Sequence, residues 1–195
     1  MRRTAAEAAE TRRSILAAAR ASFAEHGYAA TGTTELVTQL GLTRGALYHH
    51  FADKADLFAA VFTEVEEELN AAVNEAATAA AGDGTRAAIL AGARACIEYM
   101  GRPDYRQIAS ADGPAVLGLD RWHEVDRSIG LESMRAGLQA LDDEGSLAVA
   151  LTPALVVALF GALTELGLSH ARGDLTVAQA SAGFTSLLDR LVADH

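Results

Sequence analysis

The fold of this chain is decided by residues 33–57, TTELVTQLGLTRGALYHHFADKADL. Leu36, Val37 and Leu40 fall on one face of a short predicted helix over 35–40. Gly41-Leu42-Thr43 then turns the chain, and the Thr43 hydroxyl is suited to cap a second short helix over 44–50. Two short helices joined by a tight turn that contains glycine predict a helix-turn-helix.

Outward from this stretch, apolar residues recur at helical spacing along almost the whole chain. Only three prolines interrupt 195 residues, and alanine dominates, so we expect an all-α fold with almost no sheet. The pattern predicts about nine helices in total. Besides the two above, they cover 11–26, Asp53 to about Gly82, a segment ending at Gly101, 104–111, 119–141, 153–171 and 176–193.

Charge is divided unevenly along the sequence. The net charge of −10 would ordinarily disfavour a polyanionic partner. Residues 1–54, however, hold seven basic and five acidic side chains, while the remainder holds nine basic and 21 acidic ones. A mildly basic N-terminal region, residues 1–54, followed by a strongly acidic body, residues 55–195, favours DNA binding by the N-terminal end only.

Composition also bears on the compartment. A single cysteine, Cys96, excludes an intrachain disulfide, and we expect it to be a small buried apolar residue. The N-terminal residues are charged and lack the apolar stretch of a signal peptide, so a cytoplasmic protein is expected. The apolar run 153–163 is shorter than the roughly 20 residues of a membrane span, so we interpret it as a buried helix face. Arg2 and Arg3 suit a mobile basic tail better than a minor-groove arm.

The segment 33–57 resembles the DNA-binding signature of the TetR family of transcriptional regulators. The strongest matches are Gly41-Leu42-Thr43, Leu47-Tyr48, Phe51 and the spacing onward to Lys54 and Leu57, with the preceding 27–31, GYAAT, also fitting. The resemblance implies a DNA-binding domain over 1–56 and a ligand-sensing and dimerisation domain over 57–195. It further implies a homodimer formed through the last two helices, a palindromic operator in double-stranded DNA and an unidentified small-molecule effector. We expect no cofactor, metal or membrane partner.

On this resemblance, helix 44–50 enters the major groove of DNA. Gly45 and Ala46 are small enough to let its leading end approach the bases, and Arg44 is suited to a guanine contact, with a phosphate contact as the alternative. Gly32 departs from the family, which usually has a capping Thr or Ser there, so a neighbouring threonine is expected to take that contact. The predicted DNA-binding residues are Thr33, Thr34, Thr43, Arg44, Gly45, Ala46, Tyr48, His49, His50 and Lys54.

The acidic body is expected to hold the effector among its bulky or adaptable side chains. The candidates are Phe62, Tyr99, Met100, Trp122, His123 and Met134, with Trp122 the leading one. The function implied is a ligand-responsive regulator, with repression as the default direction. Two alternatives are a helical enzyme that keeps a helix-turn-helix and a structural DNA-binding protein without a sensor. The first lacks a recognisable catalytic spacing, and the acidic body argues against the second.

Overall fold

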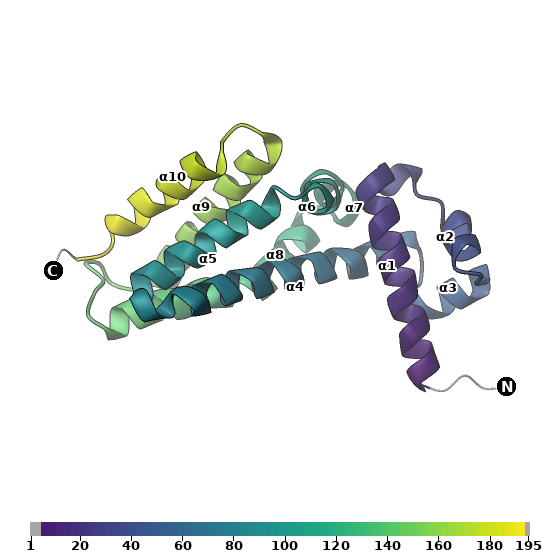
Figure 1. Ribbon diagram of the computed structural model, residues 1–195, viewed down its shortest axis with the longest axis horizontal. Coiled ribbons are helices and arrows are strands. Elements are labelled where there is room, and N and C mark those ends of the chain that lie inside the picture. The colour runs from purple at the N-terminus through teal and green to yellow at the C-terminus, as the bar shows by residue number, and fades with distance from the viewer. Residues whose placement is uncertain (1–4, 194–195) are drawn as a thin grey trace. The chain divides into compact units, whose positions relative to one another are not determined.

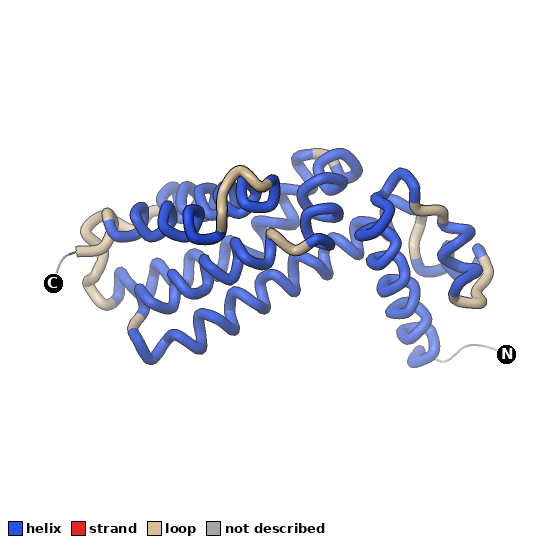
Figure 2. The backbone as a smooth tube through the Cα atoms, turned by 45° about the horizontal axis from the view of Figure 1, so that its top comes forward, coloured by secondary structure: helices blue, strands red, loops and turns tan. Residues whose placement is uncertain are grey.

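A computed structural model describes residues 5–193, so Arg2 and Arg3 lie outside the described residues. The described chain consists of helices and loops with no strand, and its only bridge pairing joins Leu147 and Val192 (Figures 1 and 2). The all-α prediction is therefore confirmed.

The first four helices follow the sequence pattern closely. They are α1 (Ala5–Ala30), α2 (Thr33–Gln39), α3 (Arg44–His50) and α4 (Lys54–Ala80). α1 begins six residues earlier than predicted and is broken at Gly27, whose φ of 76° is non-helical. That break falls where the sequence predicts the end of the first helix, because glycine tolerates positive φ at low cost.

The later elements are α5 (Thr85–Met100), α6 (Pro103–Tyr105), α7 (Gly113–Leu117), α8 (Leu119–Asp143), α9 (Pro153–Arg172) and α10 (Val177–Asp189). A 3-10 turn, η1 (Ala81–Asp83), follows α4, and a π-helix, η2 (Arg106–Asp112), joins α6 to α7. The single short helix predicted over 104–111 is thus three pieces. With 103–117 counted as one element, and η1 as the end of α4, residues 5–193 hold the nine helical segments expected.

The chain folds into two compact units. The first unit comprises the described residues through Val65 together with Pro103–Trp122, and the second comprises Glu66–Arg102 and the described residues from His123 onward. The division differs from the predicted boundary at residue 56. The segment around η2 lies far along the chain from the N-terminal helices, yet it belongs to the same unit. Local sequence patterns do not reveal this pairing.

Three aromatic rings form the centre of the first unit. Phe23 of α1 and Phe58 of α4 are fully buried, and their ring centroids lie 5.2 Å apart in an edge-to-face arrangement. Tyr28 completes the group at 5.9 Å from Phe23 and 5.3 Å from Phe58. Such ring pairs stabilise a core beyond the area they bury, so this cluster fixes α1 against the start of α4.

Polar contacts join α1 to the segment around η2. Arg20 donates to the Asp104 carboxylate at 2.9 Å. The Tyr28 backbone N–H donates to Asp112 at 2.7 Å, and the Gln107 amide donates to the same carboxylate at 3.1 Å. Since Asp112 satisfies the backbone just after the Gly27 break, it holds the end of α1 in place.

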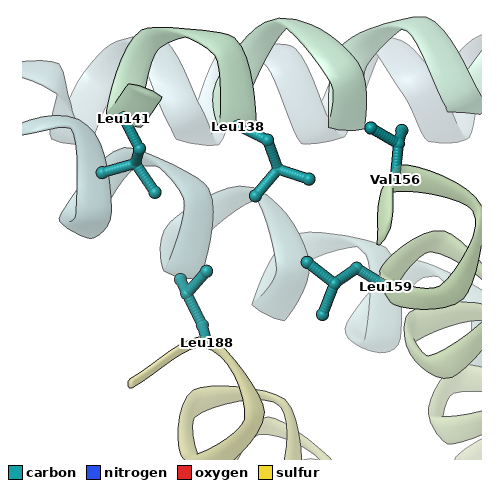
Figure 3. Packing of buried hydrophobic residues seen from close by; sticks show 5 residues of the cluster. All are labelled: Leu138, Leu141, Val156, Leu159 and Leu188. Carbon is teal, nitrogen blue, oxygen red and sulfur yellow. The ribbon is translucent and has the colours of Figure 1, made fainter. Parts of the chain in front are cut away.

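The second unit is built around an aliphatic cluster. Its buried members come from α8, α9 and α10: Leu138, Leu141, Val156, Leu159 and Leu188 (Figure 3). Partly buried apolar side chains from α5 and from the loop before α9 pack against them, including Ile89, Leu90 and Leu151. Burial of this apolar surface holds the bundle together.

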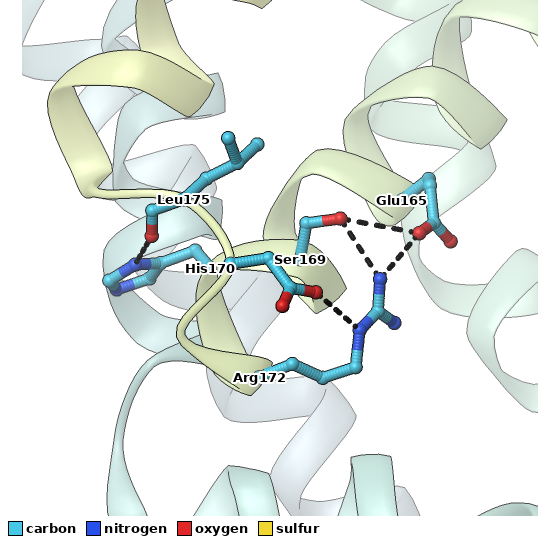
Figure 4. A network of polar contacts seen from close by, with 6 residues as sticks. Glu165, Ser169, His170, Arg172 and Leu175 are labelled. Atoms are coloured by element: carbon cyan, nitrogen blue, oxygen red, sulfur yellow. Dashed lines mark hydrogen bonds and ion pairs between the residues drawn. The ribbon is translucent and has the colours of Figure 1, made fainter.

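The turn from α9 into α10 is defined by polar contacts (Figure 4). Arg172 donates to Glu165 at 2.7 Å, Ser169 at 2.9 Å and Asp174 at 3.1 Å, while the His170 ring bonds the Leu175 carbonyl at 3.0 Å. Gly173 adopts the left-handed conformation that ends α9, and a capping box of Thr176 and Gln179 begins α10. The local sequence therefore specifies where the chain reverses.

α9 is unusually apolar over its whole length. The apolar run 153–163 is too short for a span, but an 18-residue stretch within α9 has a mean hydropathy of 1.6, so the helix could cross a membrane by length and composition alone. Core helices of soluble proteins have the same property. Only 28% of this apolar stretch is buried within the chain, so α9 has apolar surface that the monomer leaves uncovered.

Candidate functional site

α3 has one buried face and one exposed face. Leu47 is completely buried, whereas Arg44, Gly45 and His49 are exposed and Tyr48 retains 41% of its surface. Tyr48 shares this exposed face with Arg44, Gly45 and His49, so the face combines an aromatic ring with a positive charge. The outward face of α3 is thus the side of the first unit that is available to a partner.

Tyr48 is held in position by its neighbours. Its phenol is hydrogen-bonded with Thr33 at the start of α2 and with Arg44, and these bonds lower the pKa of Tyr48 below its usual value of 10.0. The Arg44 guanidinium carbon lies 5.7 Å from the centroid of the Tyr48 ring. Three of the predicted DNA-binding side chains, Thr33, Arg44 and Tyr48, are therefore brought together across α2 and α3.

The N-termini of α2 and α3 are capped differently. Thr43 is the N-cap of α3, and its hydroxyl accepts a hydrogen bond from the Ala46 backbone N–H at 3.2 Å, as predicted. Gly32 is the N-cap of α2 and provides no side-chain bond. Thr34, one residue into α2, is exposed. A methyl group added at Gly32 would lie 3.3 Å from the Glu35 carboxylate, so an acidic side chain lies beside this end of α2.

The histidines and Lys54 occupy different surroundings. The rings of exposed His49 and half-buried His50 lie edge to face at 5.3 Å. The Lys54 ammonium lies 4.3 Å from the centroid of the Tyr28 ring, and partial burial lowers the pKa of Lys54, against the opposing charge of Asp112. A phosphate contact by Lys54, which the sequence predicts, would need its ammonium to leave that ring.

The second unit encloses a cavity of about 320 Å³, lined by residues of α4, α5, α8 and α9. Of the six predicted ligand-binding residues, only Met134 lines it. Tyr99 is buried with its hydroxyl donating to Glu68 at 2.8 Å, and Met100 packs closely against Gly167. Tyr99 and Met100 therefore pack in the core of the second unit and do not border this cavity.

The other three candidates also lie outside this cavity. Phe62 is fully buried in the first unit. Trp122, the leading candidate, belongs to the first unit as well, where its indole N–H donates to the Ala109 carbonyl at 2.9 Å. His123 is exposed at the surface. The bulk that suggested a pocket role is used by Phe62 and Trp122 to pack the first unit.

Asp126, a carboxylate of the second unit, has a raised pKa. Burial raises the pKa of Asp126 on α8 to about 6 from 3.8, with Arg127 acting in the opposite direction. The folded state therefore binds this proton more tightly than the unfolded state, and the free energy of unfolding falls as pH rises from about 4 through 6.

We expect Asp126→Asn to raise the free energy of unfolding by about 1–3 kcal/mol at pH 7.5 and to change it little at pH 4. Urea titrations followed by circular dichroism at both pH values measure this. Glu124→Gln, an exposed position beyond the first turn of the same helix, is the control and should change the free energy of unfolding little at either pH. An equal gain at both pH values for Asp126→Asn would contradict this account.

Comparison with known proteins gives the family. Residues 15–61 match the model described as bacterial regulatory proteins, tetR family, and residues 86–193 match a tetracyclin repressor-like C-terminal domain. The chain belongs to the TetR family. A TetR-family transcriptional regulator from Pectobacterium atrosepticum is 35% identical, with a TM-score of 0.83, over 98% of this chain and 99% of its own.

Curated relatives match over segments that span about a third of this chain. The HTH-type transcriptional repressor BepR of Brucella suis is 52% identical over 61 residues, which is 31% of this chain and 29% of the relative. The HTH-type transcriptional repressor AcnR of Corynebacterium glutamicum is 42% identical over 65 residues, 33% of this chain and 35% of the relative. The chain thus matches only about a third of the length of these relatives.

The family consists of transcriptional regulators rather than enzymes, in agreement with the sequence interpretation. Within residues 5–193, no group of three or more His, Cys, Asp or Glu side chains is arranged to hold a metal ion. Among the described residues, the exposed face of α3 and the cavity of the second unit are two surfaces that a partner can reach.

Proposed function

We propose that this protein is a dimeric, ligand-responsive transcriptional regulator that represses its target by binding a palindromic operator. The exposed face of α3 carries the proposal: Arg44 and Tyr48 project from a helix whose other face, at Leu47, is buried. Gly45 adds almost no bulk between them, so the helix can approach base edges in the major groove. Two of the relatives are named as repressors, which supports the direction of control.

In this proposal the dimer forms through α9 and α10. Val157 of α9 and Leu187 of α10 keep 37% and 45% of their surface exposed, although both are large and apolar. A second copy of the chain would cover this surface together with the uncovered side of α9. Two α3 helices would then lie about one turn of DNA apart, roughly 34 Å, and the protein would act in the cytoplasm.

Ligand control would work by population shift. A molecule bound in the second unit would favour a state whose α3 spacing does not match DNA, and the operator would be released. α4 runs from Lys54 in the first unit to Ala80 in the second, and its second half lines the cavity. The helix therefore connects the two functions within one continuous element.

Selection from a pool of random DNA duplexes tests the proposal. We expect the full-length protein to enrich a palindrome whose half-sites are about 10 base pairs apart. Fluorescence anisotropy should then show roughly a thousandfold or greater preference for that duplex over a shuffled one, with affinity falling steeply between about 50 and 200 mM salt. Recovery of no enriched sequence, or a strictly monomeric protein in sedimentation, would overturn it.

A further inference from the structure

The cavity of the second unit is formed by small side chains. Its lining includes Gly92 of α5 and Gly130, Gly137 and Ala140 of α8. A methyl group added at Gly137 would lie 3.0 Å from Ile89, and one added at Gly130 would lie 2.8 Å from Phe160, so the helices pack closely there. The cavity is partly open to solvent, so a ligand can reach it. About 320 Å³ is at the lower end of the range for ligand pockets.

Polar groups occur on one wall of this cavity. The Ser133 hydroxyl of α8 lies 2.9 Å from the side-chain oxygen of Asn70 and 3.2 Å from that of Asn74, both on α4. Asn70 is half-buried and Asn74 is exposed, so this polar wall extends toward solvent. Each amide also has an –NH₂ group that can donate to a ligand oxygen. The remaining lining is almost entirely aliphatic or aromatic.

Charge is excluded from the lining. Among the described residues that border the cavity, none is acidic, basic or histidine. Close to Cys96, which lines it, the nearby groups are acidic: burial raises the pKa of the Cys96 thiol, and the carboxylates of Glu66 and Asp126 raise it further. A ligand carboxylate would therefore lose its hydration without gaining a cationic partner.

We propose that this cavity binds an uncharged, mainly aliphatic molecule with a single oxygen function, a hydroxyl or carbonyl, placed against Asn70, Asn74 and Ser133. The inference rests on the proposed ligand control and adds the chemical class of the ligand. A cation is disfavoured as well, because the wall offers amides and a hydroxyl but no lining carboxylate to neutralise it.

Three eight-carbon probes of different charge test this class: 1-octanol, octanoate and octylammonium at pH 7.5, each titrated into the full-length protein by calorimetry. We expect 1-octanol to bind at least about tenfold more tightly than either charged probe. Tighter binding of octanoate or octylammonium, or no binding of 1-octanol, overturns the assignment. None of these results depends on DNA, so a failure here is distinguishable from a failure of operator binding.

Two variants test whether 1-octanol binds in this cavity. Ala140→Leu should fill part of the space and weaken 1-octanol binding about tenfold, whereas Ala136→Leu, an exposed position on the same helix, should leave it unchanged. Asn70→Leu keeps the size of the side chain but removes its amide, and it should weaken binding roughly two- to tenfold. Thermal unfolding of the ligand-free variants confirms that they are folded. Unchanged 1-octanol affinity in both folded cavity variants would exclude this site.

Discussion

Replacement of Arg44 and Tyr48 together by alanine is expected to abolish measurable binding to the selected operator. Arg44→Ala alone should cost about 1–3 kcal/mol, or roughly 5- to 150-fold in affinity, if its guanidinium reads a guanine. Tyr48 is hydrogen-bonded with both Arg44 and Thr33, so its loss also frees the arginine to adopt other conformations. Anisotropy with the selected duplex measures each variant.

Controls separate base reading from general electrostatics. Arg94→Ala removes one positive charge from an exposed arginine of the second unit that is paired with Glu98, and it should leave operator affinity unchanged. If Arg44 contacts only phosphate, Arg44→Ala will weaken the selected and shuffled duplexes equally and reduce the salt dependence. Full affinity in the double variant would refute the assignment of α3 as the recognition helix.

Phe58→Ala should produce the largest loss of stability. The ring is fully buried and contacts Phe23 and Tyr28 at centroid distances of 5.2 and 5.3 Å. Its removal leaves a void at the junction of α1 and α4, for which we expect a cost of about 3–5 kcal/mol. Because Trp122 belongs to the same unit, urea unfolding followed by tryptophan fluorescence reports the change.

Tyr28→Phe is the matched variant for this test. It keeps the aromatic ring between Phe23, Phe58 and the Lys54 ammonium and removes only a hydroxyl. We expect a change below about 1 kcal/mol, since the packing is preserved. A loss as large as that of Phe58→Ala would show that the hydroxyl, and not the ring cluster, holds α1 to α4.

Local chemistry explains why the helix-turn-helix could be predicted from sequence. The Thr43 cap, the turn at Gly41 with φ of 63° and the inward positions Leu36 and Leu47 each depend on residues only a few positions apart. Patterns of this kind are readable without knowing the rest of the fold. The bounds of α3 accordingly match the prediction at both ends.

Long-range pairing could not be predicted in the same way. The segment around η2 packs in the first unit, where Asp104 and Asp112 accept hydrogen bonds from groups of α1 that are 84 residues away in the sequence. Nothing in the local sequence marks Asp112 as the acceptor for the Tyr28 backbone. The predicted boundary at residue 56 therefore follows the chain order rather than the packing.

A ligand cavity in the C-terminal domain was expected from the family resemblance, but most residues that line this one could not be named from sequence, because the candidates were bulky side chains and empty space requires small ones. One signal was available: Asn70 and Asn74 are four residues apart on α4, next to Leu69 and Val73, which also line the cavity. A pair of amides at helical spacing beside apolar positions indicates a polar spot on an inward face.

The buried position of Cys96 has a practical consequence for handling the protein. It is the only cysteine of the chain, and the raised pKa of its thiol keeps the reactive thiolate scarce at neutral pH. Disulfide-linked oligomers and oxidative damage at this sulfur should therefore form slowly in air, without added reductant. Since Cys96 also lines the cavity of the second unit, the rate at which an alkylating reagent modifies this thiol reports how readily small molecules reach that cavity.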